Sequence, residues 1–136
     1  MHDLVEIVEV GPRDGLQNES KNISVKDKIL LIDKLSNCGF NRIEVASFVS
    51  PKWIPQMADC DLVLNGLTRN ESISYSALTP NLMGLEKALL SQVNEVAIFA
   101  SASESFSKAN INCSIKESIE RFVPLMKLAK EHSLPV

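Results

Sequence analysis

Arg13 and Asp14 are adjacent residues whose side chains could do chemistry, and they lie between Gly11 and Gly15, directly after a run of apolar, β-branched residues. An aspartate supplies hard oxygen ligands for a divalent cation, and an arginine supplies fixed N–H donors for a carboxylate or a developing oxyanion. Parallel α/β folds place such groups where a strand ends and a loop begins. The alternative is a turn aspartate beside a surface arginine.

Glu44 lies within a second apolar run, residues 42–48, that is typical of a buried strand. A carboxylate among apolar neighbours needs a partner, because an unpaired buried charge is strongly unfavourable. We predict that Arg13 is this partner, and the pair could be structural, catalytic or both. Strict alternation along the strand would put Glu44 and Ala46 on one face and the following residues on the other face: Ile43, Val45 and Ser47.

Four stretches of the sequence share motifs with one known family. They are residues 11–19 (GPRDGLQNE), 47–57 (SFVSPKWIPQM), 78–82 (LTPNL) and 110–114 (NINCS). Together they resemble the 3-hydroxy-3-methylglutaryl-coenzyme A (HMG-CoA) lyases, which belong to the metal-dependent lyases and synthases built on a (β/α)8 barrel. The resemblance implies that residues 1–136 form the N-terminal half of a single (β/α)8 lyase domain of the pyruvate carboxyltransferase-like type.

The resemblance implies roles for three residues in the metal-dependent cleavage of HMG-CoA to acetyl-CoA and acetoacetate. Asp14 would be a ligand of a divalent cation, Mg2+ or Mn2+. Arg13 would face the substrate carbonyl and stabilise the enolate that forms when the carbon–carbon bond breaks. Such stabilisation is often worth about 3–4 kcal/mol per well-placed donor. Glu44 would hold Arg13 in position through a charge-assisted pair.

Four further residues are candidates for contact with an acyl-CoA substrate on the family pattern. Gln17 and Ser47 would touch the substrate or support the residues that do. Lys52 and Lys108 lie in predicted loops at the same face and could meet the phosphates of coenzyme A. Solvated surface lysines are the more common case.

The other groups that the family uses are not in these 136 residues. They are a His-x-His pair and an asparagine, which complete the metal site, and a cysteine in a Gly-rich loop. His2 and His132 do not replace the pair, because one precedes the first strand and the other ends a surface helix, where the helix dipole favours it. We therefore expect residues 1–136 alone to be inactive.

Three alternative functions stay open. The first is a related lyase for another branched 3-hydroxyacyl-CoA, and the second is a Claisen synthase of the isopropylmalate synthase type. The motif in residues 11–19 favours the lyase, because the synthases tend to read LRDGEQ there. The third alternative is a non-catalytic truncated fragment. A His-x-His pair in the downstream coding sequence would distinguish the enzymes from the fragment.

Short β-branched runs alternate with helical patterns along the chain, which is typical of parallel βα units. We expect strands at residues 4–10, 42–48, 73–78 and 95–100. We expect helices at residues 24–39, 59–67, 81–92 and 115–132, and loops at residues 49–57 and 101–112. Ser24 and Ser114 should be N-caps, and Pro124 should kink or break the last helix. Residues 134–136 resemble the start of a fifth strand.

Four βα units in series are half of an eight-unit barrel. The predicted fold class is therefore α/β, a TIM (β/α)8 barrel of which this chain supplies the first four units. A doubly wound sheet is the alternative, but the first βα turn lacks the Gly-x-Gly-x-x-Gly pattern that a dinucleotide fold prefers.

The composition narrows the choice of partners. The sequence is 45% apolar and 23% charged, with a formal net charge of −3, which is typical of a globular domain and argues against nucleic acid as a partner. No apolar run is long enough to span a bilayer, so we expect no membrane partner. Without a signal peptide or an Arg-rich presequence, we expect a cytoplasmic location. We expect the full-length protein to be a homodimer.

The chain has three cysteines with no metal-type spacing. We expect Cys38 to be a small core residue. Cys60 and Cys113 lie near predicted helix starts, where a thiolate is favoured, which leaves modest reactivity open, but we expect neither to be catalytic.

Overall fold

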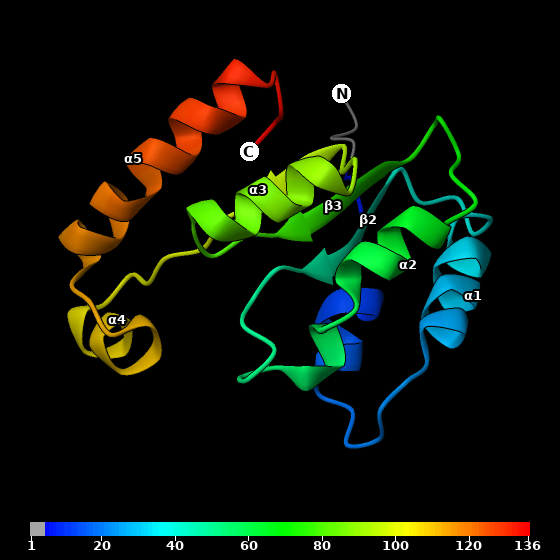
Figure 1. Ribbon diagram of the computed structural model, residues 1–136, viewed down its shortest axis with the longest axis horizontal. Coiled ribbons are helices and arrows are strands. Elements are labelled where there is room, and N and C mark those ends of the chain that lie inside the picture. Colours follow the sequence, from blue (N-terminus) through cyan, green and yellow to red (C-terminus); the bar gives the residue numbers. More distant parts are fainter. Residues whose placement is uncertain (1–4) are drawn as a thin grey trace.

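Figure 1 shows the computed structural model, which describes residues 5–136, as a parallel sheet with helices packed along it. The strands are β1 (Val8–Glu9), β2 (Arg42–Ser47), β3 (Ser74–Leu78) and β4 (Glu95–Ala97). The sheet order is β1-β2-β3-β4, and each strand pairs in parallel with the next strand of the sequence. The predicted series of parallel βα units is therefore confirmed.

Helices follow each strand. Their bounds are α1 (Val25–Leu35), α2 (Cys60–Gly66), α3 (Leu82–Leu90), α4 (Glu104–Ile111) and α5 (Ile115–Glu131). A π-helical turn, η1 (Gly11–Gly15), comes directly after β1. A single 3₁₀ turn, η2 (Pro55–Met57), interrupts the loop that was predicted at residues 49–57.

The predicted N-caps account for where two helices begin. The Oγ of Ser24 accepts a hydrogen bond from the backbone N–H of Asp27 at 3.1 Å, at the start of α1. At α5, the Oγ of Ser114 accepts the N–H of Glu117 at 3.1 Å, and the Glu117 carboxylate accepts the N–H of Ser114 at 2.7 Å. This capping box satisfies two donors that the helix leaves unpaired, and both N-cap predictions are confirmed.

Residues 104–111 form α4, where the sequence predicted a loop, so that prediction is wrong. The Oγ of Ser103 accepts the N–H of Phe106 at 3.4 Å, and Asn112 ends the helix in the left-handed conformation, with φ 51°. Asparagine adopts this conformation more readily than most residues. Only Ser107 of α4 is buried, so the helix has no apolar stripe that the sequence could reveal.

α5 runs without a break from Ile115 to Glu131, so the predicted break at Pro124 is wrong. A proline removes one backbone donor from a helix and crowds the preceding turn. Here Pro124 is exposed, whereas Ser118 before it and Leu125 and Ala129 after it are buried. Burial of these side chains holds the helix together on both sides of the proline.

β2 contains a bulge that changes which side chains share a face. Glu44 pairs with Ser76 and Ala46 pairs with Ala77, so Val45 is an extra residue in β2. Paired residues of parallel strands point to the same side, and neighbours along β3 point to opposite sides. Glu44 and Ala46 therefore lie on opposite faces, and Ser47 joins Glu44. The face assignment predicted from strict alternation is wrong beyond Glu44.

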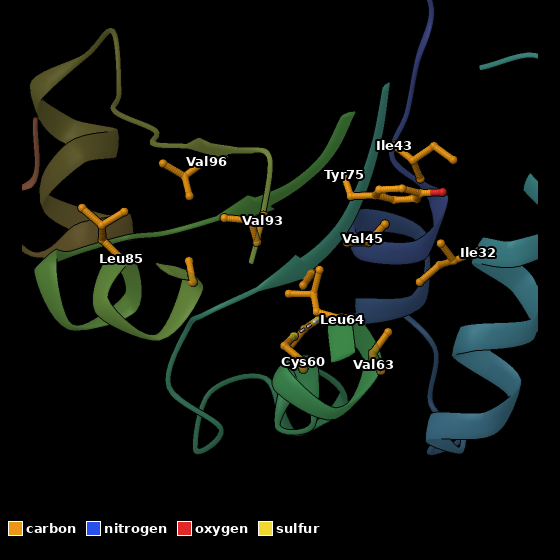
Figure 2. Packing of buried hydrophobic residues seen from close by; sticks show 14 of the residues in the cluster. Ile32, Ile43, Val45, Cys60, Val63, Leu64, Tyr75, Leu85, Val93 and Val96 are labelled. Atoms are coloured by element: carbon orange, nitrogen blue, oxygen red, sulfur yellow. Dashed lines mark hydrogen bonds between the residues drawn. The ribbon is translucent and has the colours of Figure 1, made fainter. Parts of the chain in front are cut away.

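The sheet has one apolar face and one polar face. The apolar face packs against the helices, and Figure 2 shows Ile43 and Tyr75 beside Ile32 of α1, with Leu64 of α2 below them. Complete burial of such a side chain contributes roughly 1.5–3 kcal/mol. The other face carries the ion pair of Arg42 with Glu95. The hydrogen bond and the charge of Glu95 raise the pKa of Arg42 above its ordinary value.

The two edge strands of the sheet, β1 and β4, are shorter than the predicted strands at residues 4–10 and 95–100. β1 is short, and Leu4, at the start of the predicted first strand, lies outside the described residues. At the other edge, the N–H of Val96 donates to the carbonyl oxygen of Pro135 at 3.0 Å. Pro135 therefore lies beside β4, although residues 134–136 are not a strand here.

Residues 1–136 in isolation should self-associate. Among residues 5–136, β1 has a partner strand on one side only, and Val5 and Ile7 just before it are 85% and 67% exposed. Unpaired strand edges with apolar side chains recruit other chains. We expect size-exclusion chromatography with light scattering to detect dimers or larger species, and Ile7→Lys to shift them towards the monomer. Leu90→Lys, at an exposed site on α3, is the control; a parent that stays monomeric at all concentrations would contradict the prediction.

Candidate active site

The turn after β1 positions Arg13 and Asp14. The N–H groups of Arg13 and Asp14 both donate to the carbonyl oxygen of Val10, at 3.1 Å and 2.7 Å, which closes η1. The N–H of Gly11 donates to the carboxylate of Glu9 at 2.6 Å. Single π-type turns of this kind occur often at functional sites. The predicted projection of the two side chains from the C-terminal end of β1 is confirmed.

Arg13 and Glu44 form the predicted ion pair, with Nε of Arg13 donating to the carboxylate of Glu44. Their side chains are only 16% and 10% exposed, so the pair is largely removed from solvent. The two residues are 31 positions apart and belong to different βα units. Because a buried charge needs a partner, this contact fixes η1 against β2.

Asp14 is more open than its neighbour. Its Oδ1 accepts a hydrogen bond from Nη1 of Arg13 at 2.8 Å, and its side chain is 54% exposed. Nη2 of Arg13 makes no hydrogen bond with residues 5–136, so part of the guanidinium can serve a ligand. The arrangement is a held guanidinium beside an accessible carboxylate.

Ser47 lies at the end of β2 on the face that carries Glu44. It is completely buried, and its Oγ has no hydrogen-bond partner among the described residues. Its backbone N–H donates to the sulfur of Cys60 at 3.3 Å. Most buried hydroxyls are hydrogen-bonded, so an unpartnered one is a feature that a ligand contact would explain.

Three other predicted contact residues, Gln17, Lys52 and Lys108, make no hydrogen bond or ion pair with Arg13 or Glu44 among the described residues. Gln17 is half-buried and lines a pocket of about 350 Å³ with residues 53–56. Lys52 is exposed in the loop after β2, and Lys108 is exposed on α4 rather than in a loop. Within the part of the chain that the structure describes, neither lysine bonds to Arg13 or Glu44.

Asp14 is the one residue that we predicted as a metal ligand. Residues 5–136 contain no group of three or more His, Cys, Asp or Glu side chains that could hold a metal ion. The exposed carboxylate of Asp14 fits a hard cation as a single oxygen donor, which would need donors from elsewhere. His132 is exposed at the C-cap of α5, as predicted, and His2 lies outside the described residues.

Sequence reasoning missed a buried polar cluster between α1 and the loop that follows β2. Lys28 on α1 is buried and bonds to Asp59 and to the backbone of Gln56. The signal was available, because Lys28 is in helical phase with the buried residues Ile32 and Ser36. The contacts join α1, in the first βα unit, to the loop that follows β2, in the second unit.

The cysteines differ from their predicted environments. Cys38 is exposed, not in the core. Cys60 is the first residue of α2 but is buried against Ser47, and this burial raises the pKa of its thiol to about 11. A thiol with that pKa stays protonated at neutral pH, so the modest reactivity that the sequence left open for Cys60 is not supported. Cys113, just before α5, is buried as well.

The profile of the HMGL-like family matches residues 4–136. The chain belongs to the HMGL-like family. Its fold matches a solved HMG-CoA lyase of Pseudomonas aeruginosa with a TM-score of 0.93 and 58% identity, over 96% of this chain and 43% of that chain. The four βα units of this HMGL-like chain therefore match the N-terminal part of a TIM barrel, as predicted.

Two further comparisons concern ligands and length. A curated Pseudomonas aeruginosa protein, named 3-hydroxy-3-isohexenylglutaryl-CoA/hydroxy-methylglutaryl-CoA lyase, is 58% identical over 97% of this chain and 44% of its own length. An HMG-CoA lyase of Acinetobacter baumannii, solved with coenzyme A and 3-methylmalate, is 40% identical, with a TM-score of 0.89 over 94% of this chain and 42% of that chain. The chain thus spans less than half the length of these relatives.

No helix among residues 5–136 is long and apolar enough to cross a membrane.

Alkylation of the native protein should distinguish the cysteines. With iodoacetamide at pH 8, we expect rapid labelling of Cys38 and none of Cys60, because only a small fraction of a thiol with a pKa near 11 is thiolate and the side chain is buried. Peptide mass spectrometry before and after denaturation measures both rates. Labelling of Cys60 at the rate of Cys38 in the native protein would be inconsistent with this environment.

Proposed function

We propose that the full-length protein is an HMG-CoA lyase, an enzyme that cleaves 3-hydroxy-3-methylglutaryl-CoA to acetyl-CoA and acetoacetate. The observation that carries the proposal is the Arg13–Asp14 pair at the end of β1, with Arg13 held by the buried Glu44. The resemblance in residues 11–19 and the names of the relatives agree with it. Residues 1–136 would form the N-terminal half of one (β/α)8 domain.

The reaction needs stabilisation of negative charge at one place. A base takes the proton of the tertiary hydroxyl, and the C2–C3 bond breaks. Its electron pair becomes the thioester enolate, while the hydroxyl carbon becomes the ketone of acetoacetate; protonation of the enolate then gives acetyl-CoA. The N–H groups of Arg13 that are not used by Glu44 or Asp14 would donate to the enolate oxygen, where preorganised donors act most strongly.

Asp14 would hold the divalent cation of this enzyme, Mg2+ or Mn2+, together with donors from other parts of the protein. A bound cation of this kind supplies Lewis-acid polarisation of hydroxyl and carboxyl oxygens. Glu44 would keep the Arg13 guanidinium in the orientation that the enolate requires. Gln17 and Ser47 would contact the acyl group, and Lys52 and Lys108 the phosphates of coenzyme A. The complex of the Acinetobacter relative with coenzyme A supports an acyl-CoA substrate.

A second candidate is a lyase for a longer branched substrate. The Pseudomonas aeruginosa relative is named for both an isohexenylglutaryl and a methylglutaryl thioester. A single methylene in an apolar pocket changes kcat/KM about 10–200-fold, so thioesters that differ by several carbons should give clearly different kcat/KM at one site. Comparison of kcat/KM for the two thioesters distinguishes the candidates. A cytoplasmic location and a homodimer are also part of the proposal, which cell fractionation and light scattering of the full-length protein would check.

The test of the function is release of acetoacetate from HMG-CoA by the full-length protein with Mg2+ or Mn2+. We expect Arg13→Lys to reduce turnover about 10²–10³-fold with a smaller change in KM, because the planar set of donors is lost at the enolate. Arg121→Lys, at an exposed site on α5, is the matched control. Condensation of acetyl-CoA with a 2-oxo acid, without cleavage of HMG-CoA, would favour the synthase instead.

Asp14→Ala should weaken the binding of the divalent cation itself. Removing the carboxylate takes away one oxygen donor, so we expect a higher Kd for Mn2+ in calorimetric titration of the full-length protein. Asp61→Ala, another exposed carboxylate outside the site, should leave the Kd unchanged. An unaltered Mn2+ affinity of the Asp14 variant would remove this residue from the ligand set.

A further inference from the structure

A buried lysine lies beneath the two loops that lead away from the site. Lys28 of α1 is 4% exposed. Its Nζ donates to Oδ1 of Asp59 at 2.6 Å and also to the backbone carbonyl oxygen of Gln56. Both acceptors belong to the segment between β2 and α2. An ammonium group out of solvent is stable only with such acceptors, so the segment must stay where Lys28 can reach it.

Gln56 continues the connection in the other direction. It is 6% exposed, and its Oε1 accepts the backbone N–H of Ile23 at 3.0 Å. Its Nε2 donates to the carbonyl oxygen of Lys21 at 2.9 Å. Lys21 and Ile23 lie between η1 and α1. One side chain of the second loop therefore satisfies two backbone groups of the first loop.

The two connected loops are those that follow the residues of the site. The first loop begins just after Arg13, Asp14 and Gln17, and the second begins just after Ser47. Both loops line the pocket of about 350 Å³ described above, with Gln17 on one side and residues 53–56 on the other. The contacts of Gln56 with Lys21 and Ile23 link the two loops directly. The contacts of Lys28 fasten the second loop to α1, the helix that follows the first loop, so together they limit how far apart the walls of this pocket lie.

We propose that Lys28, Gln56 and Asp59 form a clamp that holds the β1–α1 loop against the β2–α2 loop, and that Lys28 is a positioning residue for the bound substrate. The second part rests on the function proposed above. Without the clamp, the loops must be ordered when the substrate binds, and this ordering makes the binding free energy less favourable. Loss of the clamp should therefore raise KM more than it lowers kcat.

The test uses Lys28→Met and Gln56→Met in the full-length protein, because methionine matches the length of both side chains and removes their polar groups. Lys26→Met, at an exposed site on the same helix, is the matched control, and Lys28→Arg restores a cation. Hydrogen exchange measures the backbone of residues 17–24 and 49–57, with residues 74–78 of β3 as an internal reference. Steady-state kinetics with HMG-CoA measures kcat and KM.

We expect both methionine variants to increase exchange in the two loops about tenfold or more, with unchanged exchange in β3, and to raise KM about tenfold. Lys28→Arg should have a KM between those of Lys28→Met and the parent, and Lys26→Met should match the parent in both exchange and KM. Unchanged loop exchange would overturn the clamp. Faster loop exchange with an unchanged KM would overturn the positioning role. If the parent does not cleave HMG-CoA, the proposed function and the positioning role fail together, while exchange still decides the clamp.

Discussion

A carboxylate buried in a parallel strand requires a cation, and this requirement links the first two βα units of the chain. Glu44 meets it with Arg13, which arrives from a turn 31 residues earlier. Because the guanidinium cannot leave without stranding the carboxylate, the turn that carries it is held against β2. Asp14 follows Arg13 directly, so the same contact decides where the accessible carboxylate stands. The geometry of the whole site follows from one ion pair.

Different interactions stabilise the two faces of the sheet. The face towards the helices is apolar and close-packed, and it gains free energy from burial without regard to direction. The opposite face depends on directional polar contacts, such as Arg42 with Glu95 and Arg13 with Glu44. The first kind makes the fold stable, and the second kind determines where individual polar groups lie. A barrel enzyme needs both on the same strands.

Local signals in the sequence predicted local structure well. Ser24 and Ser114 indicated helix starts because capping involves residues only three positions apart. The Arg13–Glu44 pair was predictable over a long distance because few partners suit a buried charge. α4 was missed because its polar residues give no periodic apolar pattern. The bulge at Val45 was missed because it depends on the register with β3, which no stretch of β2 encodes by itself.

The extra residue in β2 also limits how the site can be transplanted. Glu44 and Ser47 are three positions apart, and on a regular strand an odd separation puts two side chains on opposite sides. They share a side here because Val45 shifts the alternation by one. Copying both residues onto an idealised barrel strand would direct one of them into the helix layer. The irregularity must therefore be copied with the side chains, and sequence identity at those positions is not enough to rebuild the site.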